Sequence, residues 1–383
     1  MHHSYWEKQQ WGSTDHAVIG AGFVGLFCAL ALRKRFPQDR IVILERGYLP
    51  TGASTRNAGF ACFGSVGELE DDLKTTTLDE VLATVELRYK GLRELRRVVG
   101  DDAMDYQPTG GWEALDPHNA DVLLDRVDFW NRELSAILGG SRPGSRIRNS
   151  VESRSVLRPA FAKAQLPTPH RNFYSTAIFN SYEGALNPAR VVRRLQQLCQ
   201  ENNIEILTGY HVTDLAKANG ALRVSNGNFE ISTQQAYVAT NGFARQLLDV
   251  PVTAVRNQVI LTAPVQDMPL RGTFHSDRGY YYWRNLGDRL LLGGARHKAL
   301  QQETTDELAP NASLQQHLLD YLQKNILPGY TINVDHEWSG ILGVGEHKQP
   351  LVKRINDHLA IGIRQGGMGV AIASQVGRQL AGL

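Results

Sequence analysis

The first fifty residues alternate between apolar runs and glycine-rich turns. Residues 16–19 predict a short buried strand, the glycines at 20–25 follow, and an apolar helix then extends to about Arg35. A second, fully apolar strand covers 41–44 and ends at Glu45. Strands that are apolar on both faces are typical of parallel sheets covered by helices. This strand, turn, helix and strand order therefore predicts an α/β fold with a parallel sheet.

Further elements follow from periodicity and turn residues. Helical spacing covers 78–98, 119–138, 188–202 and 369–381, and strand patterns cover 204–207, 221–224 and 236–240. Residues 280–296 alternate around a turn at 285–288 and predict a hairpin. The middle of the chain, about 251–335, has an antiparallel character that differs from both ends, so we expect a second domain inserted into the first.

Composition narrows the class of protein. The 383 residues contain 41 Lys plus Arg and 39 Asp plus Glu, a formal charge of +2, which gives no field that would select nucleic acid or an acidic membrane surface. The share of hydrophobic residues, 42%, argues against wholesale disorder. No apolar run approaches the ~20 residues of a membrane-spanning helix. The sequence begins MHHSYWEKQQW, which lacks a signal-peptide pattern.

The cysteines predict a compartment. Cys28, Cys62 and Cys199 cannot all pair, so we expect free thiols in a reducing, cytoplasmic environment. No cysteine or histidine cluster has zinc-ligand spacing, and we expect no metal.

The glycines at 20–25 form a G-x-G-x-x-G motif between the first strand and the first helix. Gly20 permits a tight turn, Gly22 lets the backbone approach a pyrophosphate, and Gly25 allows close packing of helix and strand. Glu45 follows about 20 residues later at the end of the second strand, where it can accept hydrogen bonds from a ribose. The motif and its context predict a dinucleotide-binding domain.

Two further loops favour FAD over a nicotinamide cofactor. After Glu45 and Arg46 comes the segment GASTRNAGF at 52–60, whose small residues and hydroxyls let backbone run beside a longer dinucleotide. A second glycine loop, GGMG at 366–369, opens the last predicted helix and directs a helix N-terminus at another electron-rich group.

In these motifs the chain resembles the D-amino-acid-oxidase-like FAD-dependent oxidoreductases, which include glycine oxidase, sarcosine oxidase and gamma-glutamylputrescine oxidase. The resemblance runs almost end to end. Besides the three loops it covers GALNP at 184–188, VATNG at 238–242, RNQ at 256–258, YWR at 282–284 and WSG at 338–340.

The resemblance implies an α/β, two-domain fold of α+β type, with a Rossmann-like FAD-binding domain and an inserted antiparallel-sheet substrate domain. The FAD-binding domain would comprise 12–90, 183–250 and 336–383, and the substrate domain 91–182 and 251–335. Members of the family transfer a hydride from the carbon beside an amine nitrogen to FAD, the imine hydrolyses, and electrons pass to dioxygen or another acceptor. We expect a small-molecule amine or amino-acid substrate, non-covalent FAD, and no nucleic-acid partner.

The residues expected to contact FAD come from these loops and from the segments that match the family. They are Gly20, Gly22, Phe23, Val24, Gly25, Glu45, Arg46, Ala53, Ser54, Asn57, Ala58, Gly59, Phe60, Val212, Thr240, Asn241, Gly242, Gly366, Gly367, Met368, Gly369 and Val370.

The residues expected at the substrate site differ from those of the relatives. The positions where relatives carry a carboxylate-binding arginine or lysine are Leu342 and Ala371 here. Arg284 and Arg56 are the candidate replacements, because a guanidinium binds a carboxylate through two hydrogen bonds. The alternatives are a surface strand residue for Arg284 and a backbone-capping or flavin-contacting residue for Arg56.

Alternation along one strand directs the rings at 280–283 to opposite faces, so two belong to the core and two can line a pocket. Tyr281 and Tyr282 are the candidates for the pocket wall. No catalytic side chain is assigned, since the flavin carries the chemistry. Two other functions stay open, a FAD-dependent 2-hydroxy-acid dehydrogenase and a non-catalytic flavin-binding subunit or electron carrier.

Overall fold

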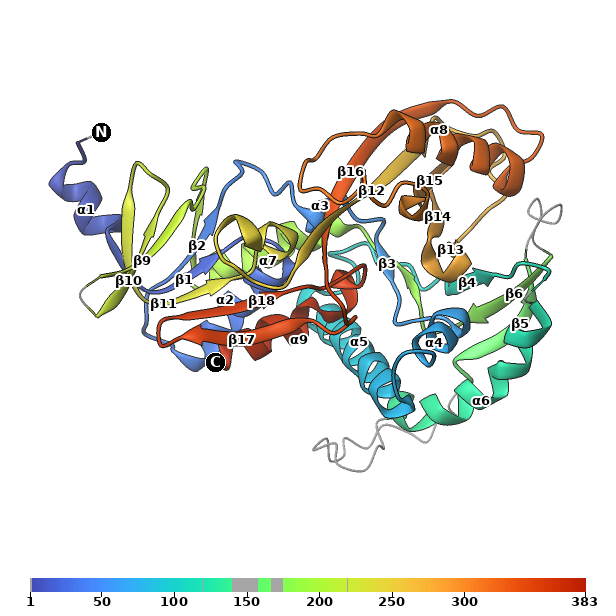
Figure 1. Cartoon of the computed structure of the whole chain (residues 1–383), viewed down its shortest axis with the longest axis horizontal. Coiled ribbons are helices and arrows are strands. Elements are labelled where there is room, and N and C mark those ends of the chain that lie inside the picture. Colours follow the sequence, from blue (N-terminus) through green and yellow to red (C-terminus); the bar gives the residue numbers. More distant parts are fainter. Residues whose placement is uncertain (1, 119, 140–157, 167–174, 219) are drawn as a thin grey trace.

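The computed structural model describes residues 2–118, 120–139, 158–166, 175–218 and 220–383, which form two lobes built around two eight-stranded sheets (Figure 1). The first sheet has the order β17-β18-β11-β1-β2-β8, and β10 and β9 extend it from β11. Its strands are β1 (Ser13–Ile19), β2 (Ile41–Glu45), β8 (Glu205–Thr208), β9 (Asp214–Ala218), β10 (Ala221–Ser225), β11 (Glu230–Val238), β17 (Leu351–Asn356) and β18 (Leu359–Ile363).

The centre of the first sheet is parallel, as the apolar strands predict. β18, β11, β1, β2 and β8 pair in parallel, and every residue of β2 except Glu45 is buried. Helix α2 (Phe23–Arg35) is apolar on nearly all sides because it lies between the sheet, α7 (Pro188–Glu201) and α9 (Gly369–Ala381). A Cβ on Gly377 would lie 2.7 Å from the carbonyl oxygen of Val24, so α2 and α9 approach closely only with glycine there.

The second sheet has the order β16-β12-β15-β14-β13-β4-β6-β5. Its strands are β4 (Gly111–Ala114), β5 (Phe161–Gln165), β6 (Thr176–Asn180), β12 (Thr253–Thr262), β13 (Thr273–Ser276), β14 (Tyr281–Leu286), β15 (Arg289–Gly294) and β16 (Val334–Val344). All pairings are antiparallel except that of β13 with β4. The predicted hairpin is β14–β15, whose turn uses Gly287 at φ +62°. The mixed α/β fold with a second, antiparallel sheet is thus confirmed.

Helices cover the second sheet and join the lobes. They are α4 (Val66–Asp72), α5 (Leu78–Val99), α6 (Ala120–Leu138), α8 (Ala312–Tyr321) and the π-helical turn η5 (Leu322–Ile326). The connecting elements are α3 (Ala53–Arg56), the strand pair β3 (Phe60–Ala61) and β7 (Gly184–Ala185), and the 3₁₀ turns η2 (Asn241–Gln246), η3 (Asp277–Gly279) and η4 (Arg296–Lys298). Helix α1 (Tyr5–Trp11) precedes β1. Among the described helices none combines the length and the apolar character that a membrane span requires.

The division into domains at 12–90, 183–250 and 336–383 against 91–182 and 251–335 stays a prediction. Two elements cross its boundaries. Most of β16 follows residue 336, yet β16 belongs to the second sheet, and α5 crosses residue 90 and packs on α9 through Gly91 and Ser374. Parts of the expected substrate domain, 140–157 and 167–174, lie outside the described residues.

Candidate functional site

The turn between β1 and α2 shows why glycine occupies its fixed positions. Gly20 has φ +104°, a conformation that residues with a side chain rarely adopt. A Cβ on Gly25 would overlap the carbonyl oxygen of Gly20, so the helix and the turn can approach each other only with glycine at that position. The first turn of α2 therefore directs its N–H groups and the positive end of its dipole at the end of the strands, where an anion is stabilised.

Glu45 stands beside this turn at the end of β2. Its Oε2 accepts a hydrogen bond from the Ala21 N–H at 2.9 Å, and its Oε1 accepts one from the Gly47 N–H at 3.0 Å. Each carboxylate oxygen has a further lone pair. The side chain can therefore hold the turn and still accept a hydrogen bond from a ribose hydroxyl.

Helix α3 is tied to the same turn. Ser54 Oγ accepts a hydrogen bond from the Phe23 N–H at 2.9 Å. Asn57 donates through Nδ2 to the Ala53 carbonyl at 3.0 Å and accepts at Oδ1 from the Gly59 N–H at 2.9 Å. The hydroxyl and amide of this segment thus fix its backbone beside the start of α2.

The C-terminal glycine loop leads into α9 with its backbone exposed to open space. Gly366 has φ +56°, and apart from the adjacent residues of the loop no described atom lies within 4 Å of a Cβ built on Gly366 or Gly367. Asn241 holds the preceding residues, because its Oδ1 accepts from the N–H groups of Arg364 at 3.0 Å and Gln365 at 3.2 Å. Asn241 therefore positions the loop by its side chain.

These segments enclose a first cavity. Of the residues predicted to contact the cofactor, it is lined by Gly20, Gly22, Phe23, Val24, Glu45, Arg46, Ala53, Ser54, Asn57, Val212, Thr240, Asn241, Gly366, Gly367, Gly369 and Val370. Thr240 Oγ1 is buried and has no hydrogen-bond partner among the described residues, so it is available to a ligand. Arg46 lies over the ring of Phe243, 3.8 Å from its centroid, in the wall of this cavity.

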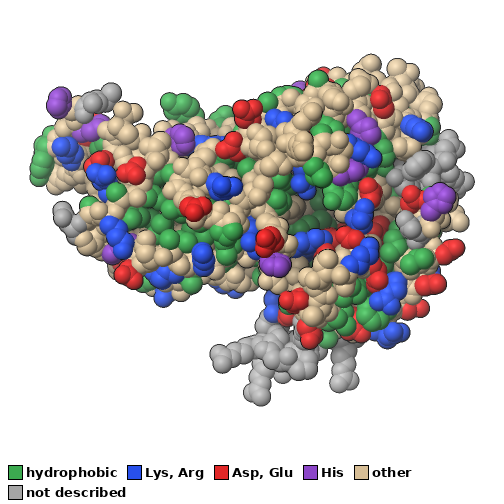
Figure 2. Space-filling view, in the orientation of Figure 1, with side chains coloured by type: hydrophobic (Ala, Val, Ile, Leu, Met, Phe, Trp, Pro, Cys, Tyr) green, Lys and Arg blue, Asp and Glu red, His purple; other side chains and the backbone are tan. Residues whose placement is uncertain are grey.

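A second cavity of about 450 Å³ continues from the first, and the two share wall residues Ala53, Asn57, Leu342, Gln365, Gly366, Gly367 and Val370. The predicted residues Ala58, Phe60 and Met368 line this second cavity, which we call the chamber. Figure 2 shows a hollow between the lobes with acidic and basic side chains around it.

Three predicted contact residues line neither described cavity. Gly25 serves the packing of α2, as shown above. Gly59 has φ +73°, and a Cβ there would overlap the Leu186 carbonyl oxygen. A Cβ on Gly242 would lie 2.7 Å from the Leu342 carbonyl oxygen. These glycines are explained by close approach of backbone segments.

Charged side chains line the chamber. Glu68 forms an ion pair with Arg88 at 3.0 Å and lies 3.5 Å from Lys348 Nζ. Burial by itself would raise the pKa of Glu68, but the two cations outweigh it and lower the pKa. Lys348 also forms an ion pair with Asp72. Glu68 is therefore ionised, and the positive charges of Arg88 and Lys348 balance its negative charge.

Burial shifts two other titratable groups of the chamber towards their neutral forms. Glu183 is buried and accepts hydrogen bonds from the N–H groups of Phe63 at 3.0 Å and Gly64 at 3.4 Å. Burial raises the pKa of Glu183 to about 8. Burial lowers the pKa of His275 to about 4, so its imidazole is uncharged. Among the described residues, no group of three or more His, Cys, Asp or Glu side chains is arranged to hold a metal ion.

Strand alternation places the two candidate tyrosines, Tyr281 and Tyr282, on opposite faces of β14. Tyr282 lines the chamber, and its ring meets Phe60 edge to face with centroids 6.0 Å apart. The interpretation of Tyr281 as a pocket wall is wrong. Its ring points to the opposite side of β14, stacks on Tyr321 at 3.9 Å between centroids, and places its hydroxyl 2.8 Å from His317 Nε2.

Arg284 also requires a correction. It is 3% exposed and lines neither of the two described cavities. Its NH1 donates to the carbonyls of Leu186 at 2.8 Å, Gly59 at 3.0 Å and Ala58 at 3.3 Å. The guanidinium is thus used to satisfy main-chain oxygens where the β3–β7 pair meets the hairpin, and neither the proposed carboxylate ligand nor the surface-strand alternative describes it.

Arg56 lines the chamber, but its donors also serve the backbone. Its Nε donates to the Thr51 carbonyl and its NH1 to the Ser339 carbonyl, both at 2.9 Å. This geometry agrees with the backbone-capping alternative. Leu342 and Ala371, the two positions where relatives carry a carboxylate-binding cation, do face the chamber as apolar residues.

Several chamber residues were missed from the sequence. They are Glu68, Arg88, Glu183, Asn257, His275 and Arg296. They come from α4, α5, β12, β13, η4 and a loop beside β7, so no local spacing brings them together. Only Asn257 could have been found from the sequence, because alternation along a strand places its side chain on the face opposite to Arg256 and Gln258.

The glycine turn, the acidic end of β2 and the continuous cavities define a dinucleotide-binding protein. Residues 15–383 match the family model described as FAD dependent oxidoreductase, and the chain belongs to this family. The family resemblance and the FAD cofactor are thereby confirmed. The protein is an FAD-dependent oxidoreductase.

Similar proteins extend over nearly the whole chain. The probable oxidoreductase OrdL of Haemophilus influenzae is 21% identical over 96% of this chain and 82% of its own length. Glycine oxidase from Geobacillus kaustophilus has a TM-score of 0.71 at 18% identity, covering 97% of this chain and 94% of that one. L-amino acid deaminase from Proteus vulgaris has a TM-score of 0.70 at 20% identity, covering 97% and 90%. At these identities the solved structures establish a shared fold.

The residues present fit FAD. A buried, unpartnered hydroxyl on Thr240, bare glycine backbone at Gly366 and Gly367, and two helix N-termini surround one continuous space. Hydroxyls, N–H groups and helix dipoles are what a pyrophosphate and a polar ring system require.

Proposed function

We propose that this chain oxidises a C–N bond of an amino acid or amine, with hydride transfer to FAD and hydrolysis of the resulting imine. When bound, FAD supplies the hydride acceptor and passes the electrons on to dioxygen or another acceptor. The observation that carries the proposal is the chamber, lined by apolar and charged side chains, that continues directly from the cofactor cavity. The names of similar proteins, glycine oxidase and L-amino acid deaminase, support an amino-acid substrate.

The chain's own residues bind and orient the substrate. Phe60, Tyr282 and Met368 supply apolar walls that exclude water, while Asn257 and His275 supply polar atoms beside them. The N-terminus of α9 opens at the junction of the two cavities, and its dipole favours a more negative charge on whatever group lies there. Stabilisation that grows as charge develops accelerates the reaction.

The set of contact residues that line the two cavities would bind FAD without a covalent bond. Burial raises the pKa of the chamber thiol Cys62 well above its ordinary value, which supports this, because only a thiolate is a good nucleophile. Three free cysteines support a reducing, cytoplasmic location.

The experiment is an anaerobic spectroscopic screen of the FAD-loaded protein. Amino acids, amines and 2-hydroxy acids are added separately, and loss of the oxidised flavin's visible absorption is recorded. The proposal expects bleaching by one or more amino acids or amines. Bleaching by 2-hydroxy acids alone would make the chain a hydroxy-acid dehydrogenase, and an oxidised flavin throughout would favour a non-catalytic flavin-binding subunit.

A further inference from the structure

Of the residues that the structure describes, six Arg or Lys side chains line the chamber, and five of them already have partners. Arg56 and Arg364 donate to main-chain carbonyls, Arg88 and Lys348 pair with Glu68, and Arg278 pairs with Asp277 at 3.1 Å and Asp71 at 3.5 Å. The sixth is Arg296. Within the part of the chain that the structure describes, its guanidinium has no hydrogen bond and no ion pair.

The backbone before Arg296 adopts an uncommon conformation. Ala295 is fully buried and has φ +61°, in the left-handed region that a residue with a side chain rarely enters. Gly294, at φ +120°, ends β15 directly before it. The chain therefore leaves the sheet sharply at this point, and η4 begins with Arg296 in the wall of the chamber. Strained residues of this kind persist where the surrounding structure holds them, often at binding sites.

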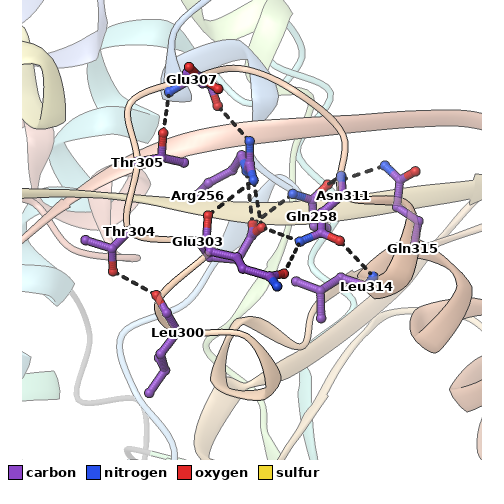
Figure 3. A network of polar contacts seen from close by, with 11 residues as sticks. Arg256, Gln258, Leu300, Glu303, Thr304, Thr305, Glu307, Asn311, Leu314 and Gln315 are labelled. Carbon is purple, nitrogen blue, oxygen red and sulfur yellow. Dashed lines mark hydrogen bonds and ion pairs between the residues drawn. The ribbon is translucent and has the colours of Figure 1, made fainter.

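A buried polar network fixes the segment that follows Arg296. Figure 3 shows Glu303 among Arg256, Gln258 and Asn311. Its carboxylate accepts hydrogen bonds from Arg256 at 2.9 and 3.2 Å, from Gln258 at 2.8 Å and from Asn311 at 2.9 Å. This network ties the loop after η4 to β12. Because Arg256 and Gln258 both face Glu303, the intervening Asn257 faces the chamber.

Two buried polar atoms without partners line the same chamber as the unpaired cation. Asn257 Oδ1 and His275 Nδ1 are buried and have no hydrogen-bond partner among the described residues, and both side chains line the chamber. Burial raises the pKa of Tyr282 to about 12, although a side-chain hydrogen bond with Asn257 and the positive charge of Arg296 both act to lower it, so Asn257 and Arg296 both act on the Tyr282 hydroxyl. Buried polar groups are normally satisfied, so a bound ligand is expected to complete the hydrogen bonds of Asn257 and His275.

We propose that Arg296 binds a carboxylate of the substrate, so that the chamber selects an amino acid over an amine that lacks a carboxylate. The inference rests on the proposed function and deepens it. A carboxylate accepts two parallel N–H···O hydrogen bonds from one guanidinium, which no other chamber cation is free to offer among the described residues. The apolar residues Leu342 and Ala371 leave this role to Arg296. Asn257 Oδ1 is then an acceptor for a substrate N–H.

The test measures carboxylate binding directly. FAD-loaded protein is titrated with hexanoate, which has no C–N bond to oxidise, and the shift of the flavin's visible spectrum gives the Kd. R296Q is compared with R278Q, which removes the same charge from the same chamber but from a cation that already has partners. FAD content and Tm are measured first for both variants. We expect R296Q to weaken hexanoate binding roughly thirtyfold or more, and R278Q to change it less than about threefold.

Other outcomes separate the inference from the proposed function. Similar weakening by both variants, unchanged binding in R296Q, or no hexanoate binding by the parent chain would each overturn the role of Arg296. If R296Q does not fold, R296K keeps the charge without the planar fork, and a loss of about tenfold is expected. If hexanoate binds through Arg296 but no amino acid or amine bleaches the flavin, the proposed function fails and the carboxylate site stands.

Discussion

The Glu45 carboxylate accepts a hydrogen bond from the Ala21 N–H at 2.9 Å, so the end of β2 is tied to the glycine turn that follows β1. Glu45→Ala removes this tie together with the acceptor for the ribose. We expect FAD affinity to fall by about 1.5–3 kcal/mol for each charge-assisted hydrogen bond lost. Titration of apoprotein with FAD, followed by quenching of flavin fluorescence, measures the change.

The matched control is Glu230→Ala on β11, where the carboxylate is exposed and lies 3.4 Å from Arg223. Exposed pairs contribute little, so this variant should bind FAD like the parent. Unchanged FAD affinity in Glu45→Ala would show that Glu45 does not contact the cofactor.

FAD should be released intact by acid precipitation. Cys62 lines the chamber, but burial holds its pKa well above the ordinary value, so the thiol stays protonated and is a poor nucleophile. Separation of the supernatant by chromatography should recover free FAD. Flavin that stays with the precipitated peptide would contradict non-covalent binding.

Arg284→Ala should destabilise the fold. The substitution leaves the buried Leu186 carbonyl without its donor and removes one of the two donors to the buried Gly59 carbonyl, and we expect a cost of about 2–4 kcal/mol in the free energy of unfolding. Urea denaturation measures this cost. Arg271→Ala is the control, since Arg271 also donates to a main-chain carbonyl, that of Gly287, but is exposed. Equal stability of the two variants would show that the buried contacts of Arg284 do not stabilise the fold.

The pH dependence of stability should reflect Glu183. Burial raises its pKa in the folded protein to about 8, above the value of 4.5 expected for an unfolded chain. The folded state therefore binds the proton more tightly, and its advantage is lost as pH rises from about 4.5 to about 8. Glu183→Gln keeps an acceptor for the N–H groups of Phe63 and Gly64 without the ionisation.

We therefore expect the stability of Glu183→Gln relative to the parent chain to increase with pH across this window, by at most about 1.4 kcal/mol per pH unit. Parallel unfolding curves for the two proteins between pH 5 and pH 8 would contradict the raised pKa.

The first sheet was predictable because its information is local. The apolar strands at 16–19 and 41–44, the glycines between them and Glu45 each specify their own conformation, and the hairpin at 280–296 was signalled by its turn. The cofactor cavity follows from the same residues, since strand ends and helix starts meet at one edge of a parallel sheet.

The chamber was harder to predict because it is built by tertiary contacts. Whether Arg284 or Arg296 meets a ligand depends on which carbonyls lie within reach, and sequence shows neither the Leu186 carbonyl beside Arg284 nor the positive φ of Ala295. Tyr281 illustrates a smaller error. Alternation correctly divided the aromatic run between two faces, but only the packing of α8 against β14 shows that Tyr281 is on the core side.

The central claim is that this chain uses FAD to oxidise a C–N bond, and product stoichiometry in a single anaerobic turnover tests it most directly. FAD-loaded protein is mixed with an amino acid that bleaches the flavin, and reduced FAD, oxo acid and released ammonia or amine are measured in the same sample. The account predicts equal amounts of all three. Reduced flavin without released nitrogen, or no reduction by any amino acid or amine, would contradict it.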